Sequence, residues 1–294
     1  MKPEIFIQIP AYRDSELQPT LYDLIRKASD WRLLRIAVAW QYDERFDKLD
    51  ADFNLRHNIE IIPIPAAESK GCNWARRLLQ EKWNGEKYTL FLDSHHRFVP
   101  GWDKILVEMY EELRSNRSSK PLISAYLPVY DPFNEPHGRG KNPLHIKLLE
   151  RQKGLMFRLN SNEIDTWKSL SGPVQAQFTS LHFLFAEGAF NETILFDPSI
   201  YFFADEIAIA LRAFTQGYDL FHPHQILGWH LYNRSTRVTH WDEHPEWAKQ
   251  SELSHQRLFR LYRGYITGRF GIGSERSVAN YERYIGMKLI DTTS

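Results

Sequence analysis

The triplet Asp93-Ser94-His95 contains two side chains that could bind one metal ion. It follows the apolar run from Tyr88 to Leu92, which predicts a buried strand ending at Asp93. Because side chains alternate along a strand, Asp93 and His95 should point to the same side. A carboxylate with an imidazole suits Mn²⁺ or a similar divalent ion better than Ca²⁺, which prefers oxygen ligands. The spacing is equally compatible with Asp93 capping the next segment and His95 lying at the surface.

A third metal ligand would have to come from another part of the chain. His230 is the natural candidate, because it lies in the apolar run from Ile226 to Tyr232. A buried histidine with satisfied hydrogen bonds is the alternative for this position. Three nearby histidines compete with it, and the sequence does not rank them: His222, His224 and His240.

Asp205 and Glu206 are the candidate catalytic carboxylates. They open a predicted helix that ends before Gly217. In the cleft, one of them could bind hydroxyls of a sugar or an acceptor, or stabilise positive charge at an anomeric carbon. Acidic residues are also favoured in the first turn of any helix by the helix dipole, so a purely structural role stays open.

The elements that position these residues alternate between strand and helix. Apolar runs predict strands at 5–9, 33–40, 59–64, 88–92, 122–128, 181–190 and 225–232. Helical spacing predicts helices at 17–29, 71–83, 102–114, 205–216 and 246–265. This order predicts an α/β fold with a Rossmann-like, doubly wound, mostly parallel sheet flanked by helices. Ligands bind beyond the carboxyl ends of such strands, where residues 10–14 and 93–96 fall.

The chain is predicted to form one catalytic domain over residues 1–245, followed by a helical extension over 246–294 that packs on it. Residues 129–175, rich in Pro, Gly, Asn and Lys, read as an elaborated connection or insertion on the acceptor side. The segment from Tyr232 to Trp241 carries Arg234, Arg237 and His240, and could close over a diphosphate. An ordinary exposed basic loop is the alternative.

The composition narrows the class of protein. The chain has 294 residues with 37 basic and 37 acidic side chains, so net charge gives no argument for a nucleic-acid partner. Cys72 is the single cysteine, which excludes an internal disulfide and a cysteine-ligated zinc site. Because neither a signal peptide nor an apolar run of transmembrane length is visible, we expect a cytoplasmic protein without a membrane partner.

Six blocks in order along residues 5–242 resemble the cytoplasmic-type N-acetylglucosaminyltransferases that modify hydroxyproline on a ubiquitin-ligase adaptor. The Asp-Ser-His element is also similar to the metal motif of polypeptide N-acetylgalactosaminyltransferases. The matching blocks are Ile9-Pro10-Ala11-Tyr12-Arg13-Asp14, Lys70-Gly71-Cys72-Asn73-Trp74-Ala75-Arg76, Leu92-Asp93-Ser94-His95-His96-Arg97-Phe98 with Gly101-Trp102-Asp103, Phe196-Asp197-Pro198, Ala210-Leu211-Arg212-Ala213-Phe214-Thr215-Gln216-Gly217-Tyr218-Asp219, and His230-Leu231-Tyr232-Asn233-Arg234.

The resemblance implies a GT-A nucleotide-diphospho-sugar transferase fold, a UDP-sugar donor, Mn²⁺ or another divalent cation, and retention of anomeric configuration. By position it implies metal binding by Asp93, His95 and His230. The residues assigned to donor and nucleotide binding are Pro10, Tyr12, Arg13, Asp14, Gln41, Arg76, Ser94, Arg234 and Arg237. The residues assigned to the acceptor side or its loop are Trp102, His240 and Trp241.

One departure concerns the sugar pocket: the family usually has Gly-Glu-Glu where this chain has Ala204-Asp205-Glu206. N-acetylglucosamine is therefore one candidate among hexoses and pentoses. The acceptor is expected to be a protein hydroxyl, with a hydroxylated or hydroxymethylated nucleic-acid base as the alternative. A nucleotide-sugar-binding protein without turnover, or a metal hydrolase, are the rival functions.

Overall fold

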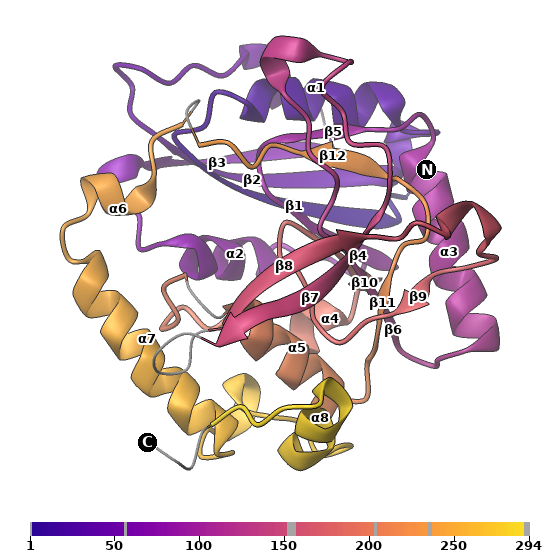
Figure 1. The fold of residues 1–294 in the computed structure, drawn as a ribbon. Helices are drawn as coiled ribbons and strands as arrows, with labels where there is room; N and C mark the ends of the chain where they lie inside the picture. The colour runs from indigo at the N-terminus through magenta and orange to yellow at the C-terminus, as the bar shows by residue number, and fades with distance from the viewer. Residues whose placement is uncertain (1, 56–57, 152–156, 203–204, 235–236, 291–294) are drawn as a thin grey trace.

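A central sheet with helices on both faces forms the body of the protein (Figure 1). The computed structural model describes residues 2–55, 58–151, 157–202, 205–234 and 237–290. In this part of the chain the sheet has eight strands in the order β3-β2-β1-β4-β10-β6-β11-β9. Their bounds are β1 (Ile5–Tyr12), β2 (Leu34–Tyr42), β3 (Ile59–Pro65), β4 (Tyr88–Leu92), β6 (Pro121–Ser124), β9 (Val174–Gln175), β10 (Phe183–Glu187) and β11 (Asp219–His222).

Alternation along β1 explains why helices cover both faces of the sheet. Ile5, Ile7 and Ile9 lie in an apolar core shared with helices α1 (Leu17–Lys27) and α3 (Trp102–Asn116). Phe6 points to the opposite face, where α2 (Cys72–Gln80) packs. Because β1 is buried on both faces, it reads as a continuous apolar run rather than an alternating one.

The C-terminal helices complete the core on the side of α5 (Asp205–Thr215). Leu258 and Leu261 of α7 (Trp247–Tyr262), and Tyr281 of α8 (Val278–Ile285), are buried in the same cluster as α5. Two short helices, α4 (Phe190–Thr193) and α6 (His240–Glu243), lie between the longer elements. In the described residues, none of the helices combines the length and apolarity that crossing a bilayer requires.

The expected α/β fold is confirmed, with one difference in strand direction. Strands β1 to β4 run parallel as predicted, but β10 is antiparallel to both β4 and β6. Since β10 runs in the opposite direction, its amino end meets the carboxyl end of β4. His182, just before β10, thereby arrives beside Asp93, whose N–H donates to the His182 carbonyl (3.3 Å).

Two small ribbons accompany the main sheet (Figure 1). Strand β5 (His96–Phe98) pairs with β12 (Gly228–His230), and β7 (Leu144–Arg151) pairs with β8 (Phe157–Glu163). The β7–β8 hairpin lies within the stretch 129–175, whose structure the sequence left open. The predicted strand at 225–232 is shorter in the structure because only residues 228–230 pair with a neighbour.

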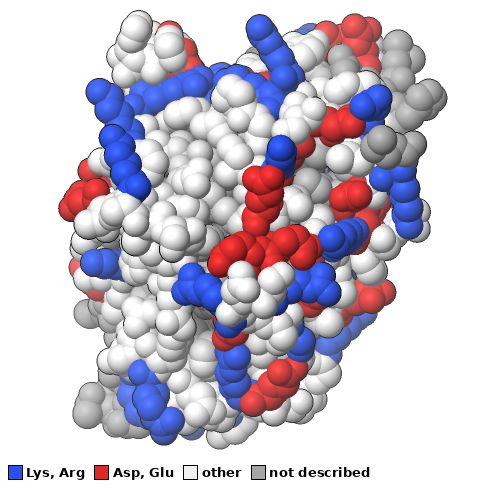
Figure 2. All heavy atoms as spheres, turned by 90° about the vertical axis from the view of Figure 1, so that its right-hand side faces the viewer, with Lys and Arg blue, Asp and Glu red and all other residues white. Residues whose placement is uncertain are grey.

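Charged side chains of both signs lie side by side on the face shown in Figure 2, with an acidic cluster at its centre. This face agrees with the balance of 37 basic and 37 acidic residues in the whole chain. A sequence-independent nucleic-acid surface needs clustered Lys and Arg, whereas this face carries acidic side chains among its basic ones.

Candidate functional site

Asp93, His95 and His230 converge on one point beyond the carboxyl end of β4. Their candidate ligand atoms all lie within 4.8 Å of one another. Asp93 Oδ2 is 3.8 Å from His95 Nε2 and 3.6 Å from His230 Nε2. The structure thus brings together the three residues that the sequence proposed as metal ligands.

Asp14 fixes the orientation of His95. The His95 Nδ1–H donates to Asp14 Oδ2 at 2.6 Å, and the Ser94 hydroxyl donates to the same oxygen at 2.6 Å. Although burial opposes its ionisation, these hydrogen bonds lower the pKa of Asp14. With Nδ1 protonated, the lone pair of His95 is on Nε2, toward Asp93 and His230. Asp14 therefore positions the imidazole, although the sequence had assigned it to the nucleotide.

Backbone pairing holds His230 opposite this pair. Its N–H donates to the Pro128 carbonyl (2.9 Å), and the following Leu231 N–H donates to the His95 carbonyl (3.1 Å). The His230 ring stacks on His182 with centroids 4.1 Å apart. Burial, to which His95 and His96 add, keeps the pKa of His230 well below its ordinary value against the opposing effect of Asp93, so the ring is neutral. A neutral imidazole is the form that binds a metal.

The unsatisfied atoms of the cluster fit a divalent cation. His95 Nε2 and both ring nitrogens of His230 are buried without a hydrogen-bond partner. Buried polar atoms of this kind are normally satisfied, so they point to a missing partner. The pKa of Asp93 is also held well below its usual range: burial opposes its ionisation, but His230, Arg76 and His95 outweigh it. One carboxylate oxygen and two imidazole nitrogens are a donor set that Mn²⁺ accepts.

Replacing Asp14 by Asn should weaken divalent-cation binding without removing a ligand. Asparagine keeps an oxygen near His95 but loses the charge that orients its Nδ1–H, and changes of this kind cost about 10- to 100-fold in metal affinity. Titration calorimetry with Mn²⁺ measures the effect. Glu44→Gln, on the exposed loop after β2, is the control and should bind Mn²⁺ like the wild type. Equal affinities for the two variants would contradict the positioning role of Asp14.

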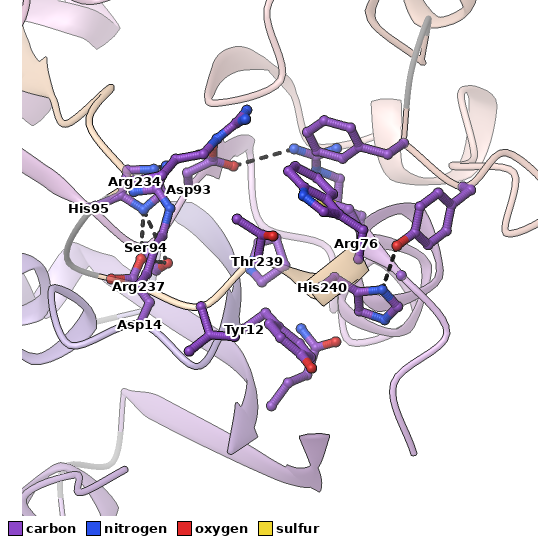
Figure 3. A pocket seen from close by; sticks show the side chains of 18 of the residues that line it. Tyr12, Asp14, Arg76, Asp93, Ser94, His95, Arg234, Arg237, Thr239 and His240 are labelled. Atoms are coloured by element: carbon purple, nitrogen blue, oxygen red, sulfur yellow. Dashed lines mark hydrogen bonds and ion pairs between the residues drawn. The ribbon is translucent and has the colours of Figure 1, made fainter. Parts of the chain in front are cut away.

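Arg76 links the candidate metal ligands (Asp93, His95 and His230, below called the metal cluster) to the acidic pair of α5. Its guanidinium lies 3.3 Å from Asp93 Oδ1 (Figure 3). It also lies 3.0 Å from Asp205 Oδ2. The Arg76 side chain is 5% exposed and Asp205 is 11% exposed, so their contact is shielded from water, whereas Asp93 is 28% exposed. Burial nevertheless raises the pKa of Asp205, against the opposing effect of Arg76.

A first cavity opens over the metal cluster and Arg76 (Figure 3). Most residues assigned to the donor line it. The rest of the wall comes from Gly71, Cys72, Tyr201, Phe202, Tyr232 and residues 238–241. The assigned residues in its lining are Pro10, Tyr12, Asp14, Gln41, Arg76, Asp93, Ser94, His95, His230, Arg234 and Arg237. His240 and Trp241 line this same cavity, so the structure places them beside the donor residues rather than on a separate acceptor side.

Tyr12 and His240 line the first cavity side by side (Figure 3). Their rings lie with centroids 4.9 Å apart, and His240 Nδ1 is 2.6 Å from the Tyr201 hydroxyl. Gln41 lies at the same cavity, where its amide donates to the Ala11 carbonyl (3.4 Å). Aromatic rings of this kind can pack against a nucleobase.

Two predicted site residues lie elsewhere. Trp102 is fully buried, and its indole N–H donates to the Leu24 carbonyl (3.0 Å). It is a core residue, which corrects its assignment to the acceptor side. Arg13 turns away from the first cavity at φ 44° and pairs with Asp47 (3.2 Å) and Glu243. These ion pairs connect the residue after β1 to the segment after β2 and to α6, and Arg13 is not part of the cavity lining.

A second cavity adjoins the first and contains the acidic pair. The two cavities share Arg76, Asp93, Phe202, Tyr232 and Arg234. Asp205 and Glu206 line the second cavity together with the β7–β8 hairpin. Ala204, where the chain departs from the usual family pattern, lies outside the described residues.

Glu206 is poised to change its charge near neutral pH. Its carboxylate accepts hydrogen bonds from the Tyr126 hydroxyl (3.2 Å) and the Leu181 N–H (3.3 Å). Burial, and then the charge of Asp205, raise its pKa to about 7. A carboxyl with this pKa can accept a hydrogen bond from a substrate hydroxyl above pH 7 and is neutral below it.

Glu206→Gln should stabilise the protein at alkaline pH. Because the native pKa lies above the ordinary value of 4.5, the folded state binds this proton more tightly than the unfolded state. The group's contribution to the free energy of unfolding is therefore lost as pH rises through 7. At pH 8.5 the variant should be more stable by about 1 to 3 kcal/mol, and at pH 4.5 equal to the wild type. Urea unfolding at the two pH values measures this, and a pH-independent difference would contradict the raised pKa.

Several residues of the two cavities were missed by sequence reasoning. Tyr201 and Thr239 line the first cavity, Tyr126 and His182 the second, and Tyr232 both. His182 could have been found from its place at the start of an apolar strand, had the antiparallel direction of that strand been considered. The tyrosines have no such signal, since an aromatic residue in the sequence is as compatible with the core as with a cavity wall.

Solved structures of glycosyltransferases are similar to this chain. The crystal structure of GalNAc-T7 with UDP, GalNAc and Mn²⁺ superposes with a TM-score of 0.59 at 13% identity, covering 97% of this chain and 55% of that chain. The structure of Staphylococcus aureus TarS 1–349 with UDP-GlcNAc gives 0.55 at 12% identity, covering 96% and 70%. The chain thus spans about half the length of GalNAc-T7, and the likeness establishes the GT-A fold.

Comparison at the level of sequence identifies the family. No curated protein sequence matches the chain. A family model described as Glycosyltransferase (GlcNAc) matches residues 4–52 and 43–291, nearly the whole chain. The predicted resemblance is thereby confirmed, and the chain belongs to the Glycosyltransferase (GlcNAc) family.

Proposed function

We propose that the protein transfers a sugar from a UDP-sugar to an acceptor hydroxyl with the help of a divalent cation. The observation that carries this proposal is the convergence of Asp93, His95 and His230 with unsatisfied ligand atoms, at the floor of a cavity that also presents Arg76. Family membership supports it, as do the UDP and Mn²⁺ in the GalNAc-T7 structure and the UDP-GlcNAc in the TarS structure.

The arrangement of the first cavity suits a nucleoside diphosphate. The aromatic rings of Tyr12 and His240 would take the base, and the diphosphate would lie over the metal cluster. A cation held by the three ligands would stabilise the negative charge on the leaving diphosphate. Arg234 and Arg237 lie in the wall of the same cavity and would add positive charge.

The reaction is proposed to retain the anomeric configuration by attack on the face from which UDP departs. The bond between the anomeric carbon and the diphosphate oxygen breaks, and the acceptor oxygen bonds to the carbon on the same face. The acceptor proton passes to the leaving diphosphate oxygen, which completes UDP. A positive charge develops on the sugar ring during this step. The carboxylates of Asp205 and Glu206 in the adjoining cavity would stabilise that charge.

The sugar and the acceptor would meet where the two cavities join, at Arg76, Asp93 and Arg234. Glu206 would accept a hydrogen bond from a hydroxyl there when it is ionised. GlcNAc is the first donor sugar to test, with other hexoses and pentoses after it. We propose a protein hydroxyl as the acceptor, with a modified nucleic-acid base as the alternative.

A donor assay tests the proposal. The protein is mixed with Mn²⁺ and, one at a time, UDP-GlcNAc, UDP-GalNAc, UDP-glucose, UDP-galactose and UDP-xylose, and UDP release is followed with and without EDTA. At least one donor should give UDP release that EDTA abolishes. Binding of UDP-sugars with no turnover, with or without acceptor, would instead support a nucleotide-sugar-binding protein. Ester hydrolysis that EDTA blocks, without nucleotide affinity, would support a hydrolase.

A further inference from the structure

Strand β8 has an edge with no paired strand in the described part of the chain, and this edge borders the second cavity. Among the described residues β8 pairs with β7 alone. Four consecutive residues from Arg158 to Ser161 all line the cavity, although successive side chains of a strand point to opposite faces. Because residues on both faces of β8 border the second cavity, the cavity lies along the edge of β8 that is not paired with β7.

The pairing of Ser161 shows that its backbone groups belong to this edge. Ser161 lies opposite Ile146 in the antiparallel ladder. The Ile146 N–H does not turn to β8, because it donates to His222 Nε2 at 3.2 Å. Ile146 and Ser161 are therefore a non-hydrogen-bonded pair, whose N–H and C=O groups face outward on both strands.

The pairing at the other end of β8 agrees. Glu163 lies opposite Leu144, and the adjacent bond runs from the Ile164 N–H to the Pro143 carbonyl at 2.9 Å. This bond flanks a non-hydrogen-bonded pair, so the backbone groups of Glu163 also face outward. By alternation Leu159 has the same orientation. Three outward amides, at every second residue, match the spacing of an added strand.

The charges along the second cavity favour a polypeptide over a nucleic acid as the chain that this edge would bind. Its lining holds three basic and four acidic side chains: Arg76, Arg158 and Arg234 against Asp93, Glu163, Asp205 and Glu206. A nucleic acid would require an excess of basic groups for its phosphates. A polypeptide requires none, since its own backbone supplies donors and acceptors for the edge.

We propose that β8 binds the acceptor as an extended polypeptide that adds to its edge as a further strand. The cavity along this edge continues to Asp93 and Arg76, so a side-chain hydroxyl of the added strand can reach the junction with the donor cavity. This inference rests on the proposed sugar transfer. It assigns peptide recognition mainly to backbone groups at Leu159, Ser161 and Glu163.

A proline at position 161 tests the edge directly. Proline lacks the outward N–H but leaves the pairing with β7 intact, because Ser161 makes no ladder bond there. The probe is a pool of synthetic 13-residue peptides, each with one central Ser, Thr or 4-hydroxyproline. We expect Ser161→Pro to lower peptide transfer, relative to donor hydrolysis in the same sample, about tenfold. Ser161→Ala keeps the N–H and should change this ratio less than about twofold.

Hydrogen exchange of the wild-type protein gives an independent measurement should the proline variant fold poorly. The best peptide of the pool is added with UDP and Mn²⁺, so that no sugar can be transferred. Exchange resolved to single amides should slow at Leu159, Ser161 and Glu163. It should stay unchanged at Asn160 and Asn162, whose amides already bond to β7 by the same alternation.

The outcomes separate the inference from the proposed function. UDP release with transfer only to DNA containing 5-hydroxymethylcytosine, or to no peptide of the pool, would leave the sugar transferase standing and overturn strand addition. Equal ratios for Ser161→Pro and Ser161→Ala, with no slowed exchange on β8, would overturn it as well. Absence of Mn²⁺-dependent UDP release from every donor would remove the function on which the inference rests.

Discussion

Asp93→Asn should lower Mn²⁺-dependent UDP release at least about 100-fold while the protein stays folded. The substitution removes the only carboxylate of the proposed ligand set, leaving two imidazoles and an uncharged amide for a divalent cation. Replacing a residue that only hydrogen-bonds to a metal ligand already lowers metal affinity or activity about 10- to 100-fold, so loss of a ligand should lower them further. Steady-state UDP release at saturating donor, across a Mn²⁺ titration, measures the effect.

A carboxylate outside both cavities supplies the control for this experiment. Asp219 pairs with Arg276 at 2.8 Å, as Asp93 pairs with Arg76, and is partly exposed. Asp219→Asn should keep wild-type UDP release and the same Mn²⁺ dependence. If Asp93→Asn released UDP as fast as Asp219→Asn, the metal assignment would be wrong.

Arg76→Met should both abolish transfer and lower the free energy of unfolding by about 3 kcal/mol. The guanidinium is the shared partner of Asp93 and Asp205, and removing it leaves two adjacent carboxylates in a buried site. Activity should fall because the positive charge between donor and acidic pair is lost. Arg76→Lys should recover stability only in part, since an ammonium cannot bridge two carboxylates as a planar guanidinium does.

The neighbouring arginine provides a matched control. Arg77 pairs with Glu81 one helical turn away at 3.0 Å, and Glu81 is 54% exposed. Exposed pairs of this kind contribute only about 0.5 kcal/mol or less. Urea unfolding of the two methionine variants therefore compares a buried bridge with a surface pair. Equal stabilities would contradict the role of Arg76 as the link between the metal cluster and α5.

Much of the fold could be predicted because its first half is made of local patterns. The strand before Asp93 and the apolar run of β1 are continuous and short, and both are buried on two faces as such runs require. Predicted boundaries differed by a few residues from those of the structure. The antiparallel course of β10 could not be predicted, because strand direction is set by the long connection before it rather than by its own residues.

The candidate site was predictable where ligands follow strand ends, as for Asp93 and His95. The role of Asp14 was missed because its partner His95 is 81 residues away, and only tertiary structure brings the two together. The assignment of Trp102 to the acceptor side was wrong for a related reason. Trp102 lies in a block that resembles the family, but its position on α3 directs it into the core. Arg76 was assigned to the donor, but its link to Asp205 needed the structure.

Anomalous diffraction from crystals soaked with Mn²⁺ and UDP tests the central claim most directly. The account predicts a manganese peak within coordination distance of one Asp93 oxygen, His95 Nε2 and His230 Nε2, with the UDP diphosphate completing the shell. The base should lie toward Tyr12 and His240. A manganese peak at any other place, with UDP bound and these three side chains empty, would contradict it.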